Sequence, residues 1–196
     1  MNDQSASSND NARPDARLPK LTLVLGGARS GKSVYAESLI AAHLDADTAI
    51  HRATYIATAE AGDGEMAQRI AAHRDRRGDQ WRTVETLLAL GDAVVDATAH
   101  GEPVLVDCLT LWLSNVMHAG LDLQAETETL RDALARAKGP VVCVSNEVGL
   151  GIVPASELGR DFRDAAGRLN QNIAAQADRV EFIAAGLPLT LKKETS

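Results

Sequence analysis

The segment LTLVLGGARSGKS, Leu21–Ser33, decides the fold of this chain. Its apolar run, Leu21–Leu25, is typical of a buried strand. The run is followed at once by GGARSGKS, Gly26–Ser33, which fits the phosphate-loop pattern G-x-x-x-x-G-K-[ST] without a mismatch. The residues that follow are apolar at helical spacing, as this pattern requires. Glycines let consecutive backbone N–H groups and a helix N-terminus face a phosphate, so the segment predicts a nucleoside triphosphate site rather than a chance glycine-rich turn.

Two side chains of this phosphate-binding loop (P-loop) have expected chemical roles. Lys32 is expected to reach the β- and γ-phosphates as a catalytic residue, and Ser33 is expected to supply a hydroxyl to Mg²⁺. The nucleotide-binding positions predicted within the loop are Gly26, Gly27, Ala28, Arg29, Ser30, Gly31, Lys32 and Ser33.

Apolar, strand-like runs alternate with helix-compatible stretches along the rest of the chain. This alternation favours an α/β fold with a mostly parallel sheet and helices on both faces. Ligands of such sheets bind at the carboxyl ends of the strands. Strands are predicted over Leu21–Leu25, Thr54–Ala57, Val104–Asp107, Val141–Ser145, Arg179–Ala184 and Leu189–Lys192, the last forming a hairpin-like edge after a turn at Leu187–Pro188. Helices are predicted over Lys32–His43, Gly64–Arg76, Leu87–His100, Leu109–Ala119, Leu123–Lys138 and Glu157–Ala177.

The composition argues against a nucleic-acid binder and against a membrane-spanning protein. A net charge of −7 argues against a general nucleic-acid binder, and no apolar run is long enough to span a bilayer. Cys108 and Cys143 lie in or beside apolar runs, which predicts buried free thiols in a reducing, cytoplasmic setting. Residues 1–19 lack the apolar core of a secretory signal and are expected to be a disordered extension. Residues 20–196 are expected to form a single nucleotide-binding catalytic domain.

Asp107 ends the apolar run VLVD. A carboxylate at the tip of a rigid strand suits a magnesium site beside a P-loop, and this interpretation is favoured. The alternative is that Asp107 caps the helix predicted to start at Leu109, because aspartate is a good N-cap residue.

A basic segment with a single histidine lies between two of the predicted strands. On a helix, Arg69, His73 and Arg76 or Arg77 would share one face. Arginines offer bidentate phosphate contacts, and nearby positive charge favours the neutral, nucleophilic form of imidazole. A solvated basic face with an exposed histidine explains the residues equally well, so the pattern by itself leaves both interpretations open.

Other polar residues give weaker signals. Asn146 and Glu147 follow a predicted strand, where they either face the ligand crevice or bound a turn. Arg163 and Arg168 are expected to be solvated or paired with Asp161 and Asp164. His43, His51, His100 and His118 lack ligand-like spacing and are expected at the surface.

With these residues in view, the chain resembles the bifunctional adenosylcobinamide kinase / adenosylcobinamide-phosphate guanylyltransferase family of cobalamin (vitamin B12) biosynthesis. The resemblance extends from about Leu21 to Lys192. The blocks that carry it are GGARSGKS at Gly26–Ser33, YIATAE at Tyr55–Glu60, HRDRRGDQWRTVE at His73–Glu85, VLVDCLTLWLSN at Val104–Asn115, and VSNEVGLGIVP with FRDAAGRLNQ within Val144–Gln171.

The resemblance implies a RecA-like P-loop NTPase fold, a homo-oligomer that is commonly a trimer, and two reactions at one enzyme. ATP or GTP first phosphorylates the aminopropanol hydroxyl of adenosylcobinamide. GTP then gives GMP to that phosphate through a GMP–histidine intermediate, releasing pyrophosphate and yielding adenosylcobinamide-GDP. His73 matches the position of the nucleophile. The same match implies nucleotide-binding roles for Ala57, Thr58, Ala59, Arg74, Asp75, Arg76, Arg77, Glu85 and Asp107, with Ser33 and Asp107 holding Mg²⁺ and Glu85 accepting hydrogen bonds from guanine.

Two alternative functions remain open at this point. One is a simple P-loop small-molecule kinase in which His73 has no chemical role. The other is a nucleotide-binding switch protein that would form no histidine adduct. A covalent guanylyl adduct on the protein distinguishes the bifunctional enzyme from both.

Overall fold

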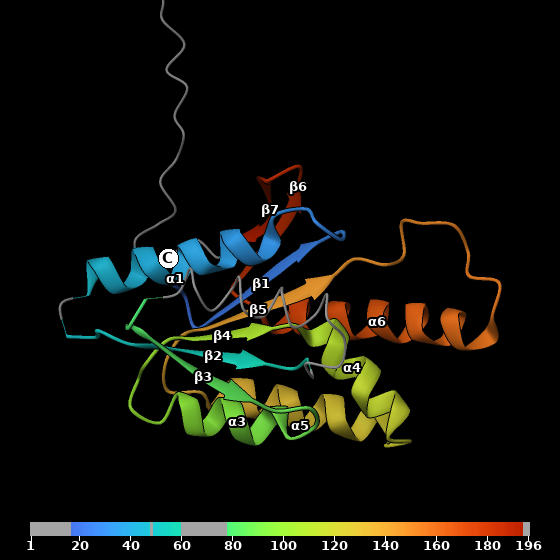
Figure 1. Ribbon diagram of the computed structural model, residues 1–196, viewed down its shortest axis with the longest axis horizontal. Helices are drawn as coiled ribbons and strands as arrows, with labels where there is room; N and C mark the ends of the chain where they lie inside the picture. Colours follow the sequence, from blue (N-terminus) through green and yellow to red (C-terminus); the bar gives the residue numbers. More distant parts are fainter. Residues whose placement is uncertain (1–16, 48, 60–77, 194–196) are drawn as a thin grey trace, which may run out of the picture.

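The computed structural model describes residues 17–47, 49–59 and 78–193. Within these ranges seven strands form one sheet in the order β3-β2-β4-β5-β1-β6-β7 (Figure 1). All neighbouring strands run parallel except β6 and β7, which pair antiparallel. The strands are β1 (Leu21–Gly26), β2 (Ala53–Ala57), β3 (Trp81–Glu85), β4 (Val104–Asp107), β5 (Val141–Asn146), β6 (Arg179–Ala184) and β7 (Leu187–Lys193).

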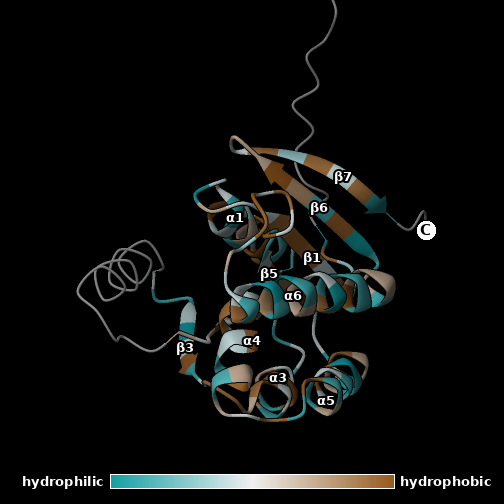
Figure 2. Ribbon diagram, turned by 90° about the vertical axis from the view of Figure 1, so that its right-hand side faces the viewer, coloured by the Kyte–Doolittle hydropathy of each residue, from teal (hydrophilic) through white to brown (hydrophobic). Residues whose placement is uncertain are grey.

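Helices cover both faces of this sheet. One buried cluster joins Leu39 and Ile40 of α1 to Val24, Leu105 and Val142 of the strands. A second cluster packs the other face against the remaining helices (Figures 1 and 2). The predicted α/β fold is confirmed, and no helix in the described ranges is long and apolar enough to cross a bilayer. The helices are α1 (Lys32–Ala46), α3 (Leu90–Ala97), α4 (Leu109–His118), α5 (Leu123–Arg136) and α6 (Glu157–Gln176).

The central strands follow the predicted ranges closely because they are buried on both faces, where continuous apolar runs are required. All six residues of β1 are buried. Strand β3 was missed by the sequence analysis. It is an edge strand whose residues are only partly buried or exposed, so its sequence WRTVE has no continuous apolar run. Helix α3 begins at Leu90 rather than at the predicted Leu87.

The antiparallel edge is confirmed, but the predicted turn at Leu187–Pro188 is wrong. The turn is formed by Ala185 and Gly186, with φ angles of 51° and 80°, and Leu187 already pairs with Ala184. Positive φ at both central residues is the geometry of a two-residue hairpin turn whose twist matches that of the strands. The helix predicted over residues 64–76 and most of the predicted N-terminal extension lie outside the described residues.

Candidate nucleotide-binding site

Four of the predicted site segments meet at the carboxyl edge of the sheet. The P-loop continues from β1, the segment Ala57–Ala59 leaves β2, and Glu85 and Asp107 are the last residues of β3 and β4. In the strand register Ala57 pairs with Glu85 on one side and with Asp107 on the other. The fold therefore brings these segments to one edge, where ligands of parallel sheets bind.

The P-loop has the backbone geometry of an anion site. Arg29 and Gly31 have positive φ angles of 57° and 97°, and the Ser30 N–H donates to the Gly27 carbonyl at 3.3 Å. Gly31 is the N-cap of α1 and supplies no side-chain cap, so the first N–H groups of the helix remain available to an anion. The Ser30 hydroxyl is buried and has no hydrogen-bonding partner in the described part of the chain. An oxyanion seated on the loop would satisfy both kinds of donor.

The turn between β6 and β7 supports the P-loop from outside. The Gly186 N–H donates to the Ser30 carbonyl at 2.8 Å. A Cβ atom on Gly31 would lie 3.2 Å from the Gly186 Cα, and one on Gly26 would lie 2.7 Å from the Ile183 carbonyl oxygen. These close approaches explain why glycine is needed at both positions in addition to the requirement for positive φ at Gly31.

Lys32 and Ser33 begin helix α1 beside this loop. Lys32 is buried, and its Nζ donates to the Gly27 carbonyl at 3.1 Å. The ammonium group therefore lies over the loop rather than in solvent, which is where a phosphate would meet it. Ser33 is partly buried, whereas Ala28 and Arg29 at the tip of the loop are exposed.

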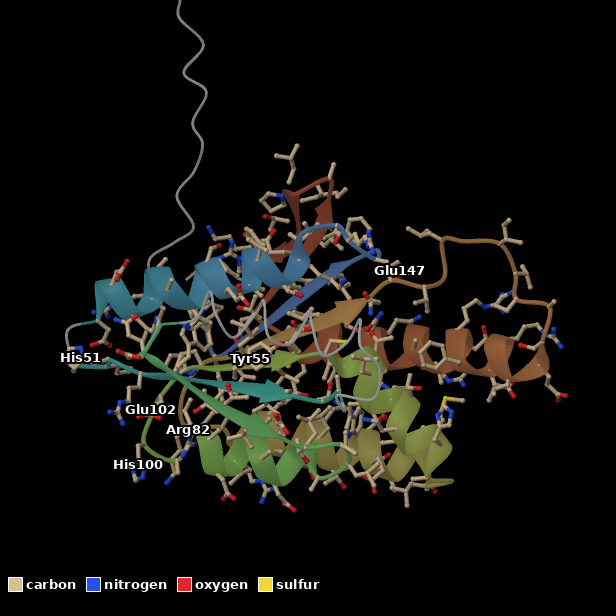
Figure 3. All side chains as sticks on the ribbon, viewed as in Figure 1. His51, Tyr55, Arg82, His100, Glu102 and Glu147 are labelled. Carbon is tan, nitrogen blue, oxygen red and sulfur yellow. The ribbon has the colours of Figure 1, made fainter. Side chains whose placement is uncertain are left out.

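Asp107 accepts a hydrogen bond from the Tyr55 hydroxyl at 3.2 Å on its Oδ2 atom. The alternative role as helix cap is wrong, because the N-cap of α4 is Cys108 and no side chain caps the helix. The Asp107 carboxylate is held by a neighbouring strand instead and remains partly exposed at the carboxyl edge. Figure 3 labels Tyr55 in the middle of the sheet.

Thr58 ties the ends of β2 and β4 together. Its buried hydroxyl donates to the Cys108 carbonyl at 2.7 Å and accepts from the Cys108 N–H at 2.8 Å. Asn115 of α4 donates to the Thr58 carbonyl at 2.8 Å and to the Leu87 carbonyl at 3.1 Å. Asn115 was not identified as a site residue from the sequence. A polar residue among the apolar residues of LTLWLSN was the only local signal for it.

A second network, also missed, supports the end of β5. The Ser145 hydroxyl donates to Asn170 Oδ1 at 2.7 Å and lies 3.1 Å from the Thr110 hydroxyl. The Asn146 N–H donates to Thr110 Oγ1 at 2.6 Å, and Asn170 Nδ2 donates to the Asn146 carbonyl at 3.2 Å. The network joins β5, α4 and α6 and fixes the backbone where β5 ends.

Glu147 continues from this strand end toward the P-loop. Its N–H donates to the Gly26 carbonyl at 3.1 Å, and its carboxylate accepts from the Gly149 N–H. The carboxylate therefore closes a turn, which was one of the two predicted roles for this residue. Figure 3 shows Glu147 at the carboxyl edge, with His51 and His100 at the opposite end of the sheet.

The predicted catalytic histidine, His73, lies outside the described residues. The same is true of its neighbours Arg74, Asp75, Arg76 and Arg77. Glu85, the last residue of that sequence block, is described and is exposed at the end of β3.

Three of the four remaining histidines, His51, His100 and His118, are exposed as predicted. The prediction for His43 is wrong, since it is 7% exposed and its Nδ1 accepts the Leu18 N–H at 3.1 Å. Burial is the main cause that lowers the pKa of His43. His43 belongs to α1, and its burial against the chain before β1 favours the neutral ring that can accept this bond.

Two arginines of α6 were expected to be solvated or paired. Arg163 pairs with Asp164, with Nη2 and Oδ1 2.8 Å apart, and Arg168 is exposed. Neither arginine is needed to explain a phosphate site.

The two cysteines are buried and free, as predicted. Burial raises the pKa of Cys108 to about 11, with a smaller contribution from the Asp107 carboxylate, and raises the pKa of Cys143 to about 12. Both thiols are therefore protonated at neutral pH and unsuited to act as nucleophiles.

The oxygen donors at the carboxyl edge fit Mg²⁺. This ion is commonly held by one or two carboxylates together with substrate phosphates and water. Ser33 offers a hydroxyl, and the Asp107 carboxylate is oriented by Tyr55. The described residues contain no group of three or more His, Cys, Asp or Glu side chains that could hold a metal ion without a nucleotide. The donor set therefore suits a magnesium ion that enters with its nucleotide.

The sequence and the fold both match known proteins. The chain is 49% identical over 174 residues to "Bifunctional adenosylcobalamin biosynthesis protein CobP" of Pseudomonas aeruginosa, covering 88% of this chain and 97% of the relative. It is 39% identical over 187 residues to "Bifunctional adenosylcobalamin biosynthesis protein CobU" of Escherichia coli, covering 88% and 99%. The flagellar accessory protein FlaH of Methanocaldococcus jannaschii shares the fold alone, with a TM-score of 0.55, 15% identity, and coverage of 98% of this chain and 87% of that chain.

The family model described as "Cobinamide kinase / cobinamide phosphate guanyltransferase" matches residues 22–191. This range includes the P-loop, Asp107 and the basic segment around His73. The chain therefore belongs to the cobinamide kinase / cobinamide phosphate guanyltransferase family.

Proposed function

We propose that this enzyme of cobalamin biosynthesis phosphorylates adenosylcobinamide and then transfers GMP from GTP to the adenosylcobinamide phosphate, through a covalent intermediate on His73. The observation that carries the proposal is the P-loop geometry. Helix α1 begins with uncapped N–H groups, and Lys32 lies over the loop at the same sheet edge as Asp107. Family membership supplies the reaction class, and the residues at this edge supply suitable chemistry for phosphoryl groups.

In the first reaction, the aminopropanol hydroxyl attacks the γ-phosphorus of a nucleoside triphosphate and loses its proton. The bond from the γ-phosphorus to the bridging oxygen breaks, and the nucleoside diphosphate leaves. The P-loop N–H groups and Lys32 stabilise the charge on the phosphate oxygens. Ser33 and Asp107 would hold Mg²⁺, which supplies further positive charge to the phosphates.

In the second reaction, a ring nitrogen of neutral His73 attacks the α-phosphorus of GTP, and pyrophosphate leaves. A phosphate oxygen of adenosylcobinamide phosphate then attacks the same phosphorus and breaks its bond to the histidine. Splitting one transfer into two steps is the advantage of covalent catalysis. Arg74, Arg76 and Arg77 would offset the negative charge that accumulates during both steps. Glu85 would accept hydrogen bonds from guanine.

The covalent intermediate provides the decisive experiment. The protein is incubated with Mg²⁺ and GTP radiolabelled at the α-phosphorus, denatured, and tested for label that survives base but not acid, as a phosphoramidate does. We expect label on the wild type and none on His73→Ala. The matched control is His100→Ala, because His100 is exposed at the opposite end of the sheet.

Two other results would contradict the proposal in different ways. If no label forms while γ-phosphoryl transfer to cobinamide is intact, the protein is a simple kinase. If His73→Ala keeps the label, another residue is the nucleophile. We further propose that the enzyme works as a homo-oligomer, commonly a trimer in the family, and in the cytoplasm, where buried free thiols such as Cys143 remain reduced.

A further inference from the structure

Strand β5 lies between the strand that leads into the P-loop and the strand that ends at Asp107. Its last residue, Asn146, pairs with Gly26 at the start of the P-loop. Val144 pairs with Asp107. Along the strand direction, the backbone of Asn146 therefore lies two residues, about 7 Å, beyond the backbone of Asp107. Asn146 therefore stands at the strand tip between the P-loop and Asp107.

The pleat of the strand decides the face on which the Asn146 side chain projects. Val142 and Val144 belong to the buried cluster under α1. Ser145 points to the other face, where its hydroxyl donates to Asn170 of α6. Because successive side chains of a strand alternate, Asn146 projects on the face covered by α1, the helix that carries Lys32.

Asp107 projects on the same face as Asn146. Leu105, two residues before Asp107, belongs to the cluster under α1, and so does Tyr55, whose hydroxyl donates to Asp107. The two polar side chains thus extend from neighbouring strands toward the beginning of α1.

Asn146 is held by its backbone, and its side chain remains available. The Asn146 N–H donates to Thr110 and the Asn146 carbonyl accepts from Asn170. Both backbone polar groups of the residue are therefore held by hydrogen bonds. Asn146 is partly buried, and no described residue forms a hydrogen bond with its carboxamide. A fixed backbone with an uncommitted polar side chain at a strand tip suits contact with a ligand rather than support of the fold.

We propose that the Asn146 carboxamide donates a hydrogen bond to the terminal phosphate of a bound nucleoside triphosphate and so distinguishes the triphosphate from a diphosphate. The inference rests on the nucleotide site proposed above. P-loop N–H groups cradle the inner phosphates, and the loop lysine reaches the outer ones. The terminal phosphate therefore extends into the space bordered by Lys32, Asp107 and Asn146. A neutral N–H donor there stabilises the added charge without competing with the Asp107 carboxylate for Mg²⁺.

Nucleotide discrimination is the experiment that tests this role. Isothermal titration calorimetry with Mg²⁺ measures the affinities of the α,β-methylene analogues of GTP and GDP. Their methylene bridge prevents loss of pyrophosphate, so no guanylyl adduct forms. The variants are Asn146→Ala, Asn146→Asp and the matched control Asn172→Asp, which adds the same charge at an exposed position of α6.

For Asn146→Ala we expect the triphosphate affinity to fall by about tenfold while the diphosphate affinity changes less than about twofold. Asn146→Asp lowers the triphosphate affinity further, because its carboxylate repels the terminal phosphate. Asn172→Asp leaves both affinities unchanged. An equal loss of affinity for both analogues, which a merely structural role would produce, overturns the proposal. Unchanged affinities of Asn146→Ala for both analogues overturn it as well. If the wild type binds neither analogue, the nucleotide site itself is wrong and the proposal falls with it.

Discussion

The Tyr55 hydroxyl donates to the Asp107 carboxylate at 3.2 Å, across the boundary between β2 and β4. Both side chains lie on the face of the sheet covered by α1, so the neighbouring strand orients the carboxylate at the edge of the proposed site. One oxygen of Asp107 is engaged by this bond, which favours a single orientation of the carboxylate toward the P-loop.

The variant Tyr55→Phe removes this hydrogen bond and keeps the aromatic ring. We expect kcat of phosphoryl transfer to cobinamide to fall by about fivefold, because the carboxylate loses a contact of about 1 kcal/mol that fixes its orientation. Asp107→Asn removes the charge itself and is expected to lower kcat by about a hundredfold or more. Steady-state kinetics at saturating Mg²⁺ measures both. Equal activity of Tyr55→Phe and wild type would show that the bond does not orient the carboxylate for the reaction.

Two glycine-to-alanine substitutions are expected to have opposite effects on stability. Gly31 has a φ of 97°, and its added Cβ would lie 3.2 Å from the Gly186 Cα, so Gly31→Ala should destabilise by about 2 kcal/mol and weaken nucleotide binding. Gly167 lies inside α6, and an added Cβ there would meet no atom within 4 Å, so Gly167→Ala should stabilise by about 1 kcal/mol. Urea unfolding measures both changes. A loss of stability in Gly167→Ala would contradict the argument from open space and helix propensity.

The sequence predicts most of the fold because its decisive signals are local. The P-loop is a contiguous motif, and strands such as Val104–Asp107 are short apolar runs ended by a polar residue. These signals do not depend on which other segments pack nearby. Strand β3 and the Ala185–Gly186 turn gave weaker local signals. The first is an edge strand whose residues are only partly buried or exposed, and the second places a non-glycine residue at positive φ.

The contacts around the candidate site depend on tertiary structure. Asn115 bonds Thr58, which is 57 positions away, and Ser145 bonds Asn170, which is 25 positions away. No spacing rule in a single sequence links such pairs. His43 was misplaced for the same reason, because its burial depends on Leu18 and the chain that leads into β1. The residues that hold the strand ends could therefore be identified only from the fold.

Loss of the buried ion pair of β6 is expected to destabilise the protein strongly. Arg179 Nε and Glu181 Oε1 are 2.6 Å apart, Glu181 is 1% exposed, and its carboxylate also accepts from Thr190 of β7. Glu181→Gln leaves the Arg179 charge buried without its partner, so we expect a loss of about 3 kcal/mol in the free energy of unfolding.

The matched control for this change is Asp164→Asn in the more exposed pair with Arg163. The Asp164 side chain is 50% exposed, and solvent screens the attraction, so the expected loss is below about 1 kcal/mol. Chemical denaturation of both variants gives the comparison. Similar losses in the two variants would mean that burial of the Arg179–Glu181 pair does not determine its contribution.

The buried thiols are expected to make the fold less stable at alkaline pH. Burial raises the pKa of Cys143 to about 12 from an ordinary value of 9.0, and the pKa of Cys108 to about 11. The unfolded chain therefore releases these protons first as the pH rises, so the free energy of unfolding falls. The contribution of each thiol is fully present below about pH 9. At about pH 10 each thiol has lost about 1.4 kcal/mol of this contribution. The loss stops growing only when the pH nears the pKa of that thiol in the folded protein.

Comparison of wild type with Cys143→Ala isolates one thiol from the other groups that titrate at alkaline pH. Denaturant unfolding at about pH 8 and about pH 10 should show a decline that is smaller in Cys143→Ala than in wild type by about 1.4 kcal/mol, whatever the variant loses in packing at both pH values. An independent measure is the rate at which iodoacetamide alkylates Cys143 at a pH near the ordinary thiol pKa. This reaction should be slow in the folded protein and fast in urea. Identical declines in the two proteins would mean that Cys143 ionises equally well in the folded chain, and that its surroundings are open to water.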